Sequence, residues 1–547
     1  MNSSDRRAWA LLALAGAVSA ALLLWLNRGG TFFNDELVWF ENLGGDNDLR
    51  SILIPHNSHL HGTTRALYLL TMETIGTKYV VFRILDAIAV LLCAGLFFAL
   101  AKRRVGNVIA IVPAILLLFF GSAWAHVVAP IGFTVLFSIA AGLVALIALE
   151  RDDRRGDVIA CGALCLSVFT FTVGLGYLVG AAISVLLRRD RLRRLWIFAI
   201  PLVLYSAWWL WAQQFDQGRT SSGQIAEIVP FIGKSLALSA GSLTGLNLSI
   251  DAAVHGDLVQ APPSLGWIPA ALVAGALVWR IARGNVPKSL WASLGVVLTY
   301  WVAAALASSP LLPQEYAVRY VFPGSVGVLL VLTDLGRGLR FNRAAVAAVI
   351  ALGAVSLAIN LDFLRDGGRA YREEYTPSAR STLAAFELAS GRDPGAGAGP
   401  AATRVVNPPV VTDLIPIIGD QYLTAVERFG SPAFTLDDVR AEPDRFRSLF
   451  DEELLLAYGT ALTPAPAPAD RAACESSAGQ IELPPGGALI RAADEGAHLS
   501  LSRFGPAPGY DLGAMPGGWV ELDLPSDGAP EPWRTAPGVE LEVCPPG

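Results

Sequence analysis

The residues best suited to chemistry lie between two long apolar runs near the N-terminus. Asp35 and Glu36 form an acidic pair soon after the first run, and His56, His59 and His61 follow before the second. Aromatic residues flank the acidic pair, which places it at an interfacial depth. A partly desolvated carboxylate there has a raised pKa and can act as a general base at neutral pH. This loop is the predicted catalytic site, and an ordinary solvated helix end is the alternative.

The histidine cluster, His56, His59 and His61, suits two kinds of ligand. Together with the acidic pair it could bind a divalent metal ion, because imidazole and carboxylate groups are common ligands. The same side chains could hydrogen-bond a phosphate or a sugar hydroxyl without a metal. Pro55 and a helical run from Leu60 place the cluster at a helix start, where backbone N–H groups favour anions. We therefore favour substrate contact, with purely structural surface histidines as a further alternative.

Other polar residues are expected at the same outer level of a membrane protein. Ionisable residues in membrane segments usually face a cavity or a partner. Arg83 and Asp86 are three residues apart and can pair. The further predicted substrate-binding residues are Arg65, Arg83, His126, Arg319 and Tyr320.

The composition excludes an ordinary soluble protein. The chain has 547 residues, of which 53% are hydrophobic and 16% charged, and its mean hydropathy is +0.48. Its apolar residues form long blocks, as membrane helices require. Eleven spans are predicted, at 8–26, 79–101, 107–121, 131–149, 157–171, 175–187, 195–211, 267–283, 289–307, 319–336 and 344–360.

Positive charges predict the orientation of these spans. Six Lys and Arg clusters recur at alternate ends of the apolar blocks, and the positive-inside rule places all six in the cytoplasm. They are Arg6-Arg7, Lys102-Arg103-Arg104, Arg151 with Arg154-Arg155, Arg188 to Arg194, Arg280 to Lys288, and Arg337 to Arg343. The N-terminus is then inside, and the C-terminal domain is outside the cell membrane. Residues 225–250 do not fit the alternation, so we expect a re-entrant or interfacial element there.

The expected fold is mainly α, a polytopic membrane helix bundle with an extracytoplasmic tail. Cys474 and Cys544 stand at the two ends of the last part, and in an oxidising compartment they are expected to form a disulfide. Alternating short apolar runs there favour a small β-sandwich. The predicted domains are a transmembrane domain over 1–364, a helix and Gly/Pro linker over 365–403, a small α/β region over 404–470 and a β-rich domain over 471–547.

Two short motifs resemble the GT-C superfamily of integral-membrane glycosyltransferases. They are Phe33-Asn34-Asp35-Glu36 after the first span and Arg319-Tyr320 near a late span. That superfamily includes protein O-mannosyltransferases, lipid A aminoarabinose transferases and the catalytic subunits of oligosaccharyltransferases. The resemblance covers roughly residues 8–360. The histidine cluster followed by Phe82-Arg83 also resembles uncharacterised bacterial membrane proteins of this type.

The resemblance implies transfer of a sugar from a polyprenyl-phosphate carrier to an acceptor on the extracytoplasmic face. Asp35 or Glu36 would deprotonate the acceptor hydroxyl, and Arg319 with Arg65 would stabilise the departing phosphate. The sequence departs from the family in lacking a second acidic motif beside His126, which argues against a metal-dependent subclass. Membrane lipids are expected partners and nucleic acids are not. The alternatives are a lipid-linked substrate transporter or flippase, and a non-catalytic scaffold that presents the tail.

Overall fold

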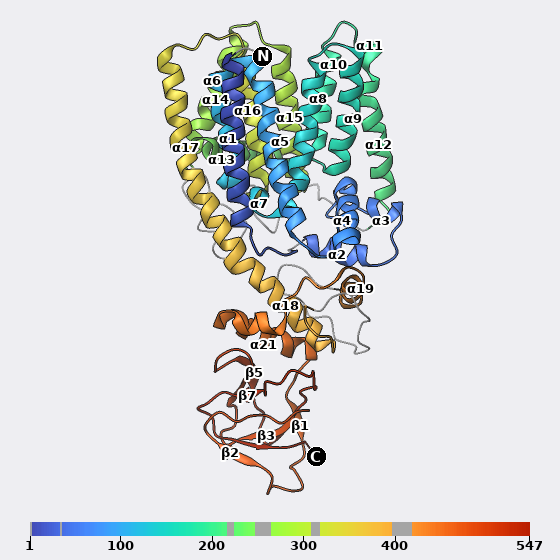
Figure 1. The fold of residues 1–547 in the computed structure, drawn as a ribbon, viewed down its shortest axis with the longest axis vertical. Helices are drawn as coiled ribbons and strands as arrows, with labels where there is room; N and C mark the ends of the chain where they lie inside the picture. The colour runs from blue at the N-terminus through green and yellow to red at the C-terminus, as the bar shows by residue number, and fades with distance from the viewer. Residues whose placement is uncertain are drawn as a thin grey trace. The chain divides into compact units, whose positions relative to one another are not determined.

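The chain forms two compact units in a computed structural model (Figure 1). Unit 1 contains residues 1–28, 48–68 and 80–372, and it is a bundle of α-helices. Unit 2 contains residues 29–47, 69–79 and 373–547, and it combines short helices with two small β-sheets. The structure describes residues 3–32, 35–215, 224–246, 264–307, 318–395 and 418–546.

The helices of unit 1 follow the apolar blocks of the sequence. Most are connected by short turns, so consecutive helices lie side by side. The α-helices of this unit are α1 (Ser3–Leu26), α3 (Leu49–Leu53), the first half of α4 (Gly62–Ile75), α5 (Val80–Val105), α6 (Asn107–Leu118), α7 (Trp124–Val127), α8 (Phe133–Leu149), α9 (Arg154–Thr170), α10 (Gly174–Leu186), α11 (Arg191–Arg194), α12 (Trp196–Ala212), α13 (Gln224–Thr244), α14 (Trp267–Ala282), α15 (Lys288–Ala307), α16 (Val321–Leu335) and α17 (Arg343–Ala370). Three short 3-10 turns, η1 (Gly121–Ala123), η2 (Pro130–Gly132) and η5 (Val318–Tyr320), complete it.

Fewer of these helices than expected are long and apolar enough to cross a membrane. In the described residues five helical stretches qualify, and a sixth does so if the bent pair 107–118 and 121–127 counts as one span. The apolar helices α10, α12, α14 and α16 have between 13 and 17 residues, whereas a span needs about 20. Helices occupy all eleven expected ranges, but their lengths do not support eleven spans.

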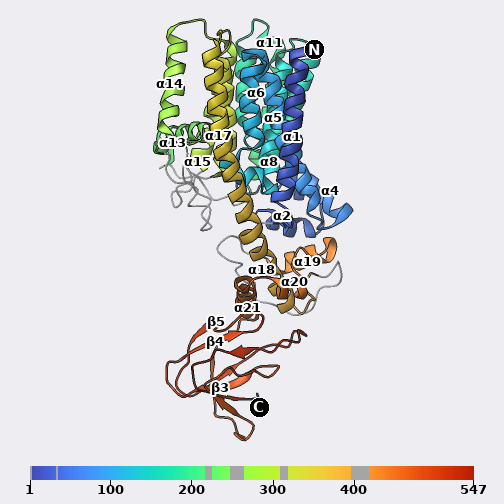
Figure 2. The ribbon, with the colours of Figure 1, turned by 60° about the vertical axis from the view of Figure 1, so that its left-hand side comes forward.

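Small residues let the helices of unit 1 approach closely. Ser138 on α8 and Ser167 on α9 each donate a hydrogen bond to the other's backbone carbonyl, at 2.8 and 2.7 Å. Beside them, α10 packs on α8, α9 and α15, and Figure 2 shows α13, α14 and α17 together at one side of the bundle. Residues 224–244 are one continuous helix, α13, and the rest of the expected re-entrant segment, 247–250, lies outside the described residues.

The six basic clusters of the sequence come together at one end of unit 1, the end that carries the N-terminus in Figure 1. Asp5 near the N-terminus lies 3.9 Å from Lys102, and Arg103 lies 3.0 Å from Glu150. The other ion pairs at this end join Arg104 to Asp334, Arg188 and Arg194 to Asp152, and Arg194 to Asp157 and Asp190. Three hydrogen bonds add to them: Lys288 donates to the Leu187 carbonyl, Arg337 to Ser289, and Arg280 to the Arg337 carbonyl. The charges that are spread along the sequence therefore share one face of the bundle.

The helical part of unit 2 is organised around a buried carboxylate. Glu387 on α18 accepts hydrogen bonds from Tyr422 at 2.7 Å, from Ser431 at 2.6 Å and from the Gly395 backbone at 3.0 Å. The rings of Tyr422 and Phe429 of α19 pack against Phe40 of α2 in tilted arrangements. Besides the second half of α4, the helices of this unit are α2 (Asp35–Gly44), the π-helix η6 (Tyr371–Tyr375), α18 (Thr376–Ala389), α19 (Gly419–Phe429), α20 (Leu436–Ala441) and α21 (Asp444–Tyr458).

The C-terminal strands form two antiparallel sheets. One has the order β1-β6-β3-β8-β2 and the other β5-β4-β7. Asp451 of α21 accepts the backbone N–H groups of Arg503, Phe504 and Gly505, which attaches α21 to the strands. The strands are β1 (Thr463–Ala465), β2 (Glu475–Ser477), β3 (Ala488–Ala492), β4 (His498–Ser502), β5 (Tyr510–Ala514), β6 (Trp519–Leu522), β7 (Arg534–Thr535) and β8 (Leu541–Cys544).

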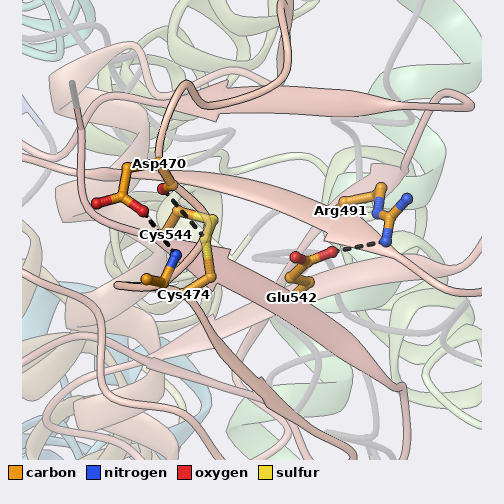
Figure 3. Close-up of a disulfide and its surroundings, with 6 residues drawn as sticks. Asp470, Cys474, Arg491, Glu542 and Cys544 are labelled. Atoms are coloured by element: carbon orange, nitrogen blue, oxygen red, sulfur yellow. Dashed lines mark hydrogen bonds and ion pairs between the residues drawn. A yellow bond between two sulfur atoms is a disulfide. The ribbon is translucent and has the colours of Figure 1, made fainter.

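The expected disulfide between Cys474 and Cys544 is confirmed, and it joins the chain before β2 to the end of β8 (Figure 3). In the same view Arg491 of β3 donates to Glu542 of β8. Residues 404–417 of the predicted α/β region lie outside the described residues. The described part of the predicted α/β region, 418–470, is mainly helical, and its one strand, β1, pairs with β6.

Candidate functional site

The histidine cluster sits on a tight turn followed by a helix start. His56 and His59 exchange both backbone hydrogen bonds, at 3.1 and 2.9 Å. The two residues between them, Asn57 and Ser58, have φ values of 48° and 64°, the left-handed pair that a two-residue hairpin turn requires. The chain then enters α4, where the Arg65 backbone N–H donates to the His61 carbonyl at 2.8 Å. The predicted helix start after Pro55 is confirmed.

Two residues from the connection between α9 and α10 complete the surroundings of the cluster. The Phe171 ring lies 4.8 Å from the His59 ring and 5.1 Å from that of His61, between centroids. Thr172 hydrogen-bonds His59 Nδ1. The His61 ring lies 5.9 Å from His56 and 6.1 Å from His59. The three imidazoles therefore line one small region of unit 1 with an aromatic ring against two of them.

Arg65 is a buried cation beside these rings. Its side chain is 1% exposed, its Nη1 donates to the Ile54 carbonyl at 2.8 Å, and its buried Nε has no hydrogen-bond partner in the described residues. No carboxylate of the described chain forms an ion pair with it, and burial alone lowers its pKa from 12.5 to about 10. Arg65 is thus charged at neutral pH and has no counter-ion within the part of the chain that the structure describes, a costly arrangement unless an anion binds.

The electrostatics of the histidine cluster also favour a bound anion. The pKa of His61 is held well below 6.5, first by burial and then by repulsion from His59, His56 and Arg65. Three neighbouring groups that can carry positive charge thus disfavour the protonation of His61. An anion among them would reverse this effect by stabilising the charged forms.

A metal ion fits this arrangement poorly. Among the described residues, the only group of three metal-ligating side chains with ligand atoms within 4.8 Å of one another is Cys474, Glu542 and Cys544. Two of those are joined in the disulfide and cannot ligate while it is formed. The ligand atoms of the three histidines do not converge in this way, so we derive no metal chemistry from them.

The other predicted substrate-binding residues form a second group in unit 1. Arg83 of α5 donates to Asn27 at 2.8 Å and to the Leu24 carbonyl, and Asn27 donates to the Val128 carbonyl at 3.3 Å. His126 is buried in α7, and its Nδ1 has no hydrogen-bond partner in the described residues. The turn η5, which carries Arg319 and Tyr320, contacts α7 and η1.

Within that turn, the exposed Arg319 guanidinium lies 5.3 Å from the Tyr320 ring, and Tyr320 packs against Phe231. The structure thus brings His126 and the Arg319-Tyr320 pair to neighbouring turns. The pairing of Arg83 with Asp86 stays a prediction.

The acidic pair belongs to unit 2. Asp35 and Glu36 form the first turn of α2, where carboxylates interact favourably with the helix dipole. Asp35 is half-buried, and Glu36 is 1% exposed and accepts a 2.6 Å hydrogen bond from the Tyr79 hydroxyl. The neighbouring aromatic residues Trp39 and Phe40 are fully buried, and the interfacial depth of the acidic pair stays a prediction. Glu36 is thus held by the fold, and Asp35 is the more accessible acid.

Some residues of these sites give no local signal in the sequence. The sequence around Phe171 and Thr172 indicates only a connection between two apolar helices, and Asn27 indicates only the end of the first helix. Glu41 of α2 is 4% exposed. Its position directly after the apolar Leu37–Phe40 run is the one signal that could have marked it as a buried acid.

No protein-family model matches this chain, and no curated protein matches it either.

Proposed function

We propose that this protein is a membrane glycosyltransferase that takes its sugar from a polyprenyl-phosphate carrier and acts on the extracytoplasmic face. The observation that carries this proposal is Arg65, which is buried, has no carboxylate partner in the described residues and interacts electrostatically with His61, whose ring neighbours those of His56 and His59. A guanidinium with neighbouring imidazoles suits a phosphate group, because charge-assisted hydrogen bonds to phosphate are strong and directional.

Two observations in separate parts of the chain support the proposed orientation of the protein. The basic clusters of unit 1 share one end, which the positive-inside rule assigns to the cytoplasm. The Cys474–Cys544 disulfide of unit 2 is expected on the oxidising side of a membrane. The α4 start and the histidine cluster lie away from the basic end of unit 1 in Figure 1, on the side that this orientation makes extracytoplasmic.

In the proposed reaction the acceptor hydroxyl oxygen forms a bond to the anomeric carbon, and the bond from that carbon to the carrier phosphate breaks. The hydroxyl proton passes to a base, and the negative charge of the leaving phosphate is met by Arg65 and the histidine cluster. Asp35 is the proposed base because it is the accessible acid of the pair, a role that rests on the GT-C resemblance.

The test is transfer of a labelled sugar from a panel of polyprenyl-phosphate donors by the purified full chain in nanodiscs. Arg65→Met and Asp35→Asn should each lower transfer by roughly 100-fold or more, because each removes a group that acts on the reacting atoms. Arg50→Gln, an exposed arginine on α3 ahead of the histidine cluster, is the matched control and should stay near wild type.

The alternatives give different results in the same assay. A flippase would move the labelled lipid across vesicles without transferring its sugar, and a scaffold would do neither. Normal transfer by both Arg65→Met and Asp35→Asn would refute the site assignment.

A further inference from the structure

A hollow in unit 2 lies between the end of α2 and the start of α19. Its volume is about 300 Å³, and its lining residues are Glu41, Asn42 and Gly45 on one side and Asp420, Gln421 and Thr424 on the other. None of its lining residues belongs to the histidine cluster, and nothing in the proposed transferase mechanism uses them.

The walls of the hollow are held together by close packing. A Cβ at Gly44 would lie 2.6 Å from the Ala425 backbone, so only glycine allows α2 to approach α19 this closely. The Phe40 ring packs at a tilt against Tyr422 and Phe429, and Arg428 donates to the Gly44 carbonyl at 3.3 Å. The hollow is therefore formed before any ligand binds, which reduces the entropy lost on binding.

The lining groups are polar and carry no cation. Glu41 is buried, and it accepts the Ile418 backbone N–H at 3.2 Å, while Asn42, Asp420, Gln421 and Thr424 are exposed around it. Burial raises the pKa of Glu41 to about 8, so at neutral pH its carboxyl can donate as well as accept a hydrogen bond.

This set of groups narrows the choice of ligand. Phosphates and carboxylates would meet Asp420 without a compensating cation. A metal ion is also disfavoured, because these acids are not among the described groups whose ligand atoms converge. Vicinal hydroxyls both donate and accept, and so do the carboxyl, amide and hydroxyl groups of this hollow taken together.

We propose that the hollow between α2 and α19 binds a neutral sugar ring, with Glu41, Asp420 and Gln421 as its main hydrogen-bonding residues. The site is a binding site for a glycan or a glycosylated acceptor, and it stands whether or not the histidine cluster binds a carrier phosphate.

The experiment is saturation-transfer NMR and calorimetric titration of the full chain in nanodiscs with neutral monosaccharides: glucose, galactose, mannose, N-acetylglucosamine and arabinose. At least one should bind saturably in the millimolar range. Asp420→Ala and Gln421→Ala alter exposed side chains and should each weaken that binding about tenfold, which is ~1.4 kcal/mol. Asp46→Asn, an exposed acid just outside the lining, should leave it unchanged.

Other outcomes overturn the proposal. The absence of saturable binding for the whole panel would do so, and so would binding that both hollow variants leave intact. Arg65→Met separates this proposal from the proposed function, because it should lower sugar transfer but not the affinity for a free neutral sugar.

Discussion

Two buried arginines of unit 1 differ in what surrounds them. Arg104, at the end of α5, lies 2.7 Å from Asp334, which also accepts hydrogen bonds from Ser289 at 2.5 Å and Ser293 at 2.6 Å. Arg65, on α4, donates to one backbone carbonyl and lies beside imidazoles. A buried charge whose partner belongs to the fold ties helices together, whereas one without such a partner is available to an external anion.

The comparison extends to the two ends of the bundle. At the basic end, several cations are matched by carboxylates of neighbouring helices, such as Arg194 by Asp157 at 3.3 Å and Arg103 by Glu150 at 3.0 Å. At the α4 start, the neighbours that lower the pKa of His61 are themselves cationic groups. A structural cluster therefore differs from a binding cluster in having a matching charge within the fold. Substituting one residue in each cluster tests this difference.

The largest expected effect is on stability at the matched arginine. Asp334→Ala should lower the free energy of unfolding by roughly 3 kcal/mol, because it removes the closer of the two carboxylates that pair with the buried Arg104 and leaves only Glu150 at 3.5 Å. Thermal unfolding in detergent measures this, with Asp362→Ala, an exposed acid on α17, as the control. An unchanged melting temperature in Asp334→Ala would mean that water or another group replaces the pair.

Removal of the unmatched arginine should affect binding and leave stability almost unchanged. Arg65→Met keeps the length and the apolar contacts of the side chain, and it should weaken binding of a phosphodiester lipid about 10- to 100-fold, as expected for lost charge-assisted hydrogen bonds. Melting temperature and lipid titration are measured on the same sample. If Arg65→Met unfolds the protein as Asp334→Ala does, the two arginines have the same structural role.

Glu41 of unit 2 is a buried acid, in contrast to the two buried arginines of unit 1. Burial raises the pKa of Glu41 from 4.5 to about 8, so the folded chain holds this proton more tightly than the unfolded chain. Its stabilising effect is complete below pH 4.5 and is lost as the pH rises through 8. Between pH 6 and pH 8 the loss should be roughly 2 kcal/mol. Glu41→Gln should remove this pH dependence, and an identical slope in both proteins would show that Glu41 is ionised throughout.

The smallest expected effect is the pH dependence of anion binding. The pKa of His61 is lowered by burial and by His59, His56 and Arg65, and a bound anion should raise it. Binding then takes up a proton, so the affinity for a phosphodiester should rise several-fold as the pH falls from about 7.5 to about 5.5. The rise should stay below about tenfold per pH unit for each proton taken up. His61→Gln should flatten this slope, and a weaker affinity at low pH would exclude an anion at the cluster.

The sequence determined the features that depend on neighbours along the chain. Apolar blocks gave helices in all the expected ranges, because helical hydrogen bonds are local. The start of α4 after Pro55 and the helix end at Gly391, whose φ is 80°, follow from turn and cap chemistry. The ends of the β-rich part, Cys474 and Cys544, were also recognisable, since two cysteines alone in an extracytoplasmic domain have one way to pair.

The tertiary structure decided which distant residues meet. His59 and Thr172 are 113 positions apart, Arg104 and Asp334 are 230 apart, and Glu41 and Ile418 are 377 apart. Such contacts depend on how whole helices pack, on small residues such as Gly44, and on the low cost of closing long loops. No single local pattern encodes them. For this reason the sequence could name Arg65 and Arg104 as cations, and only the fold showed that one is matched by a carboxylate and the other is not.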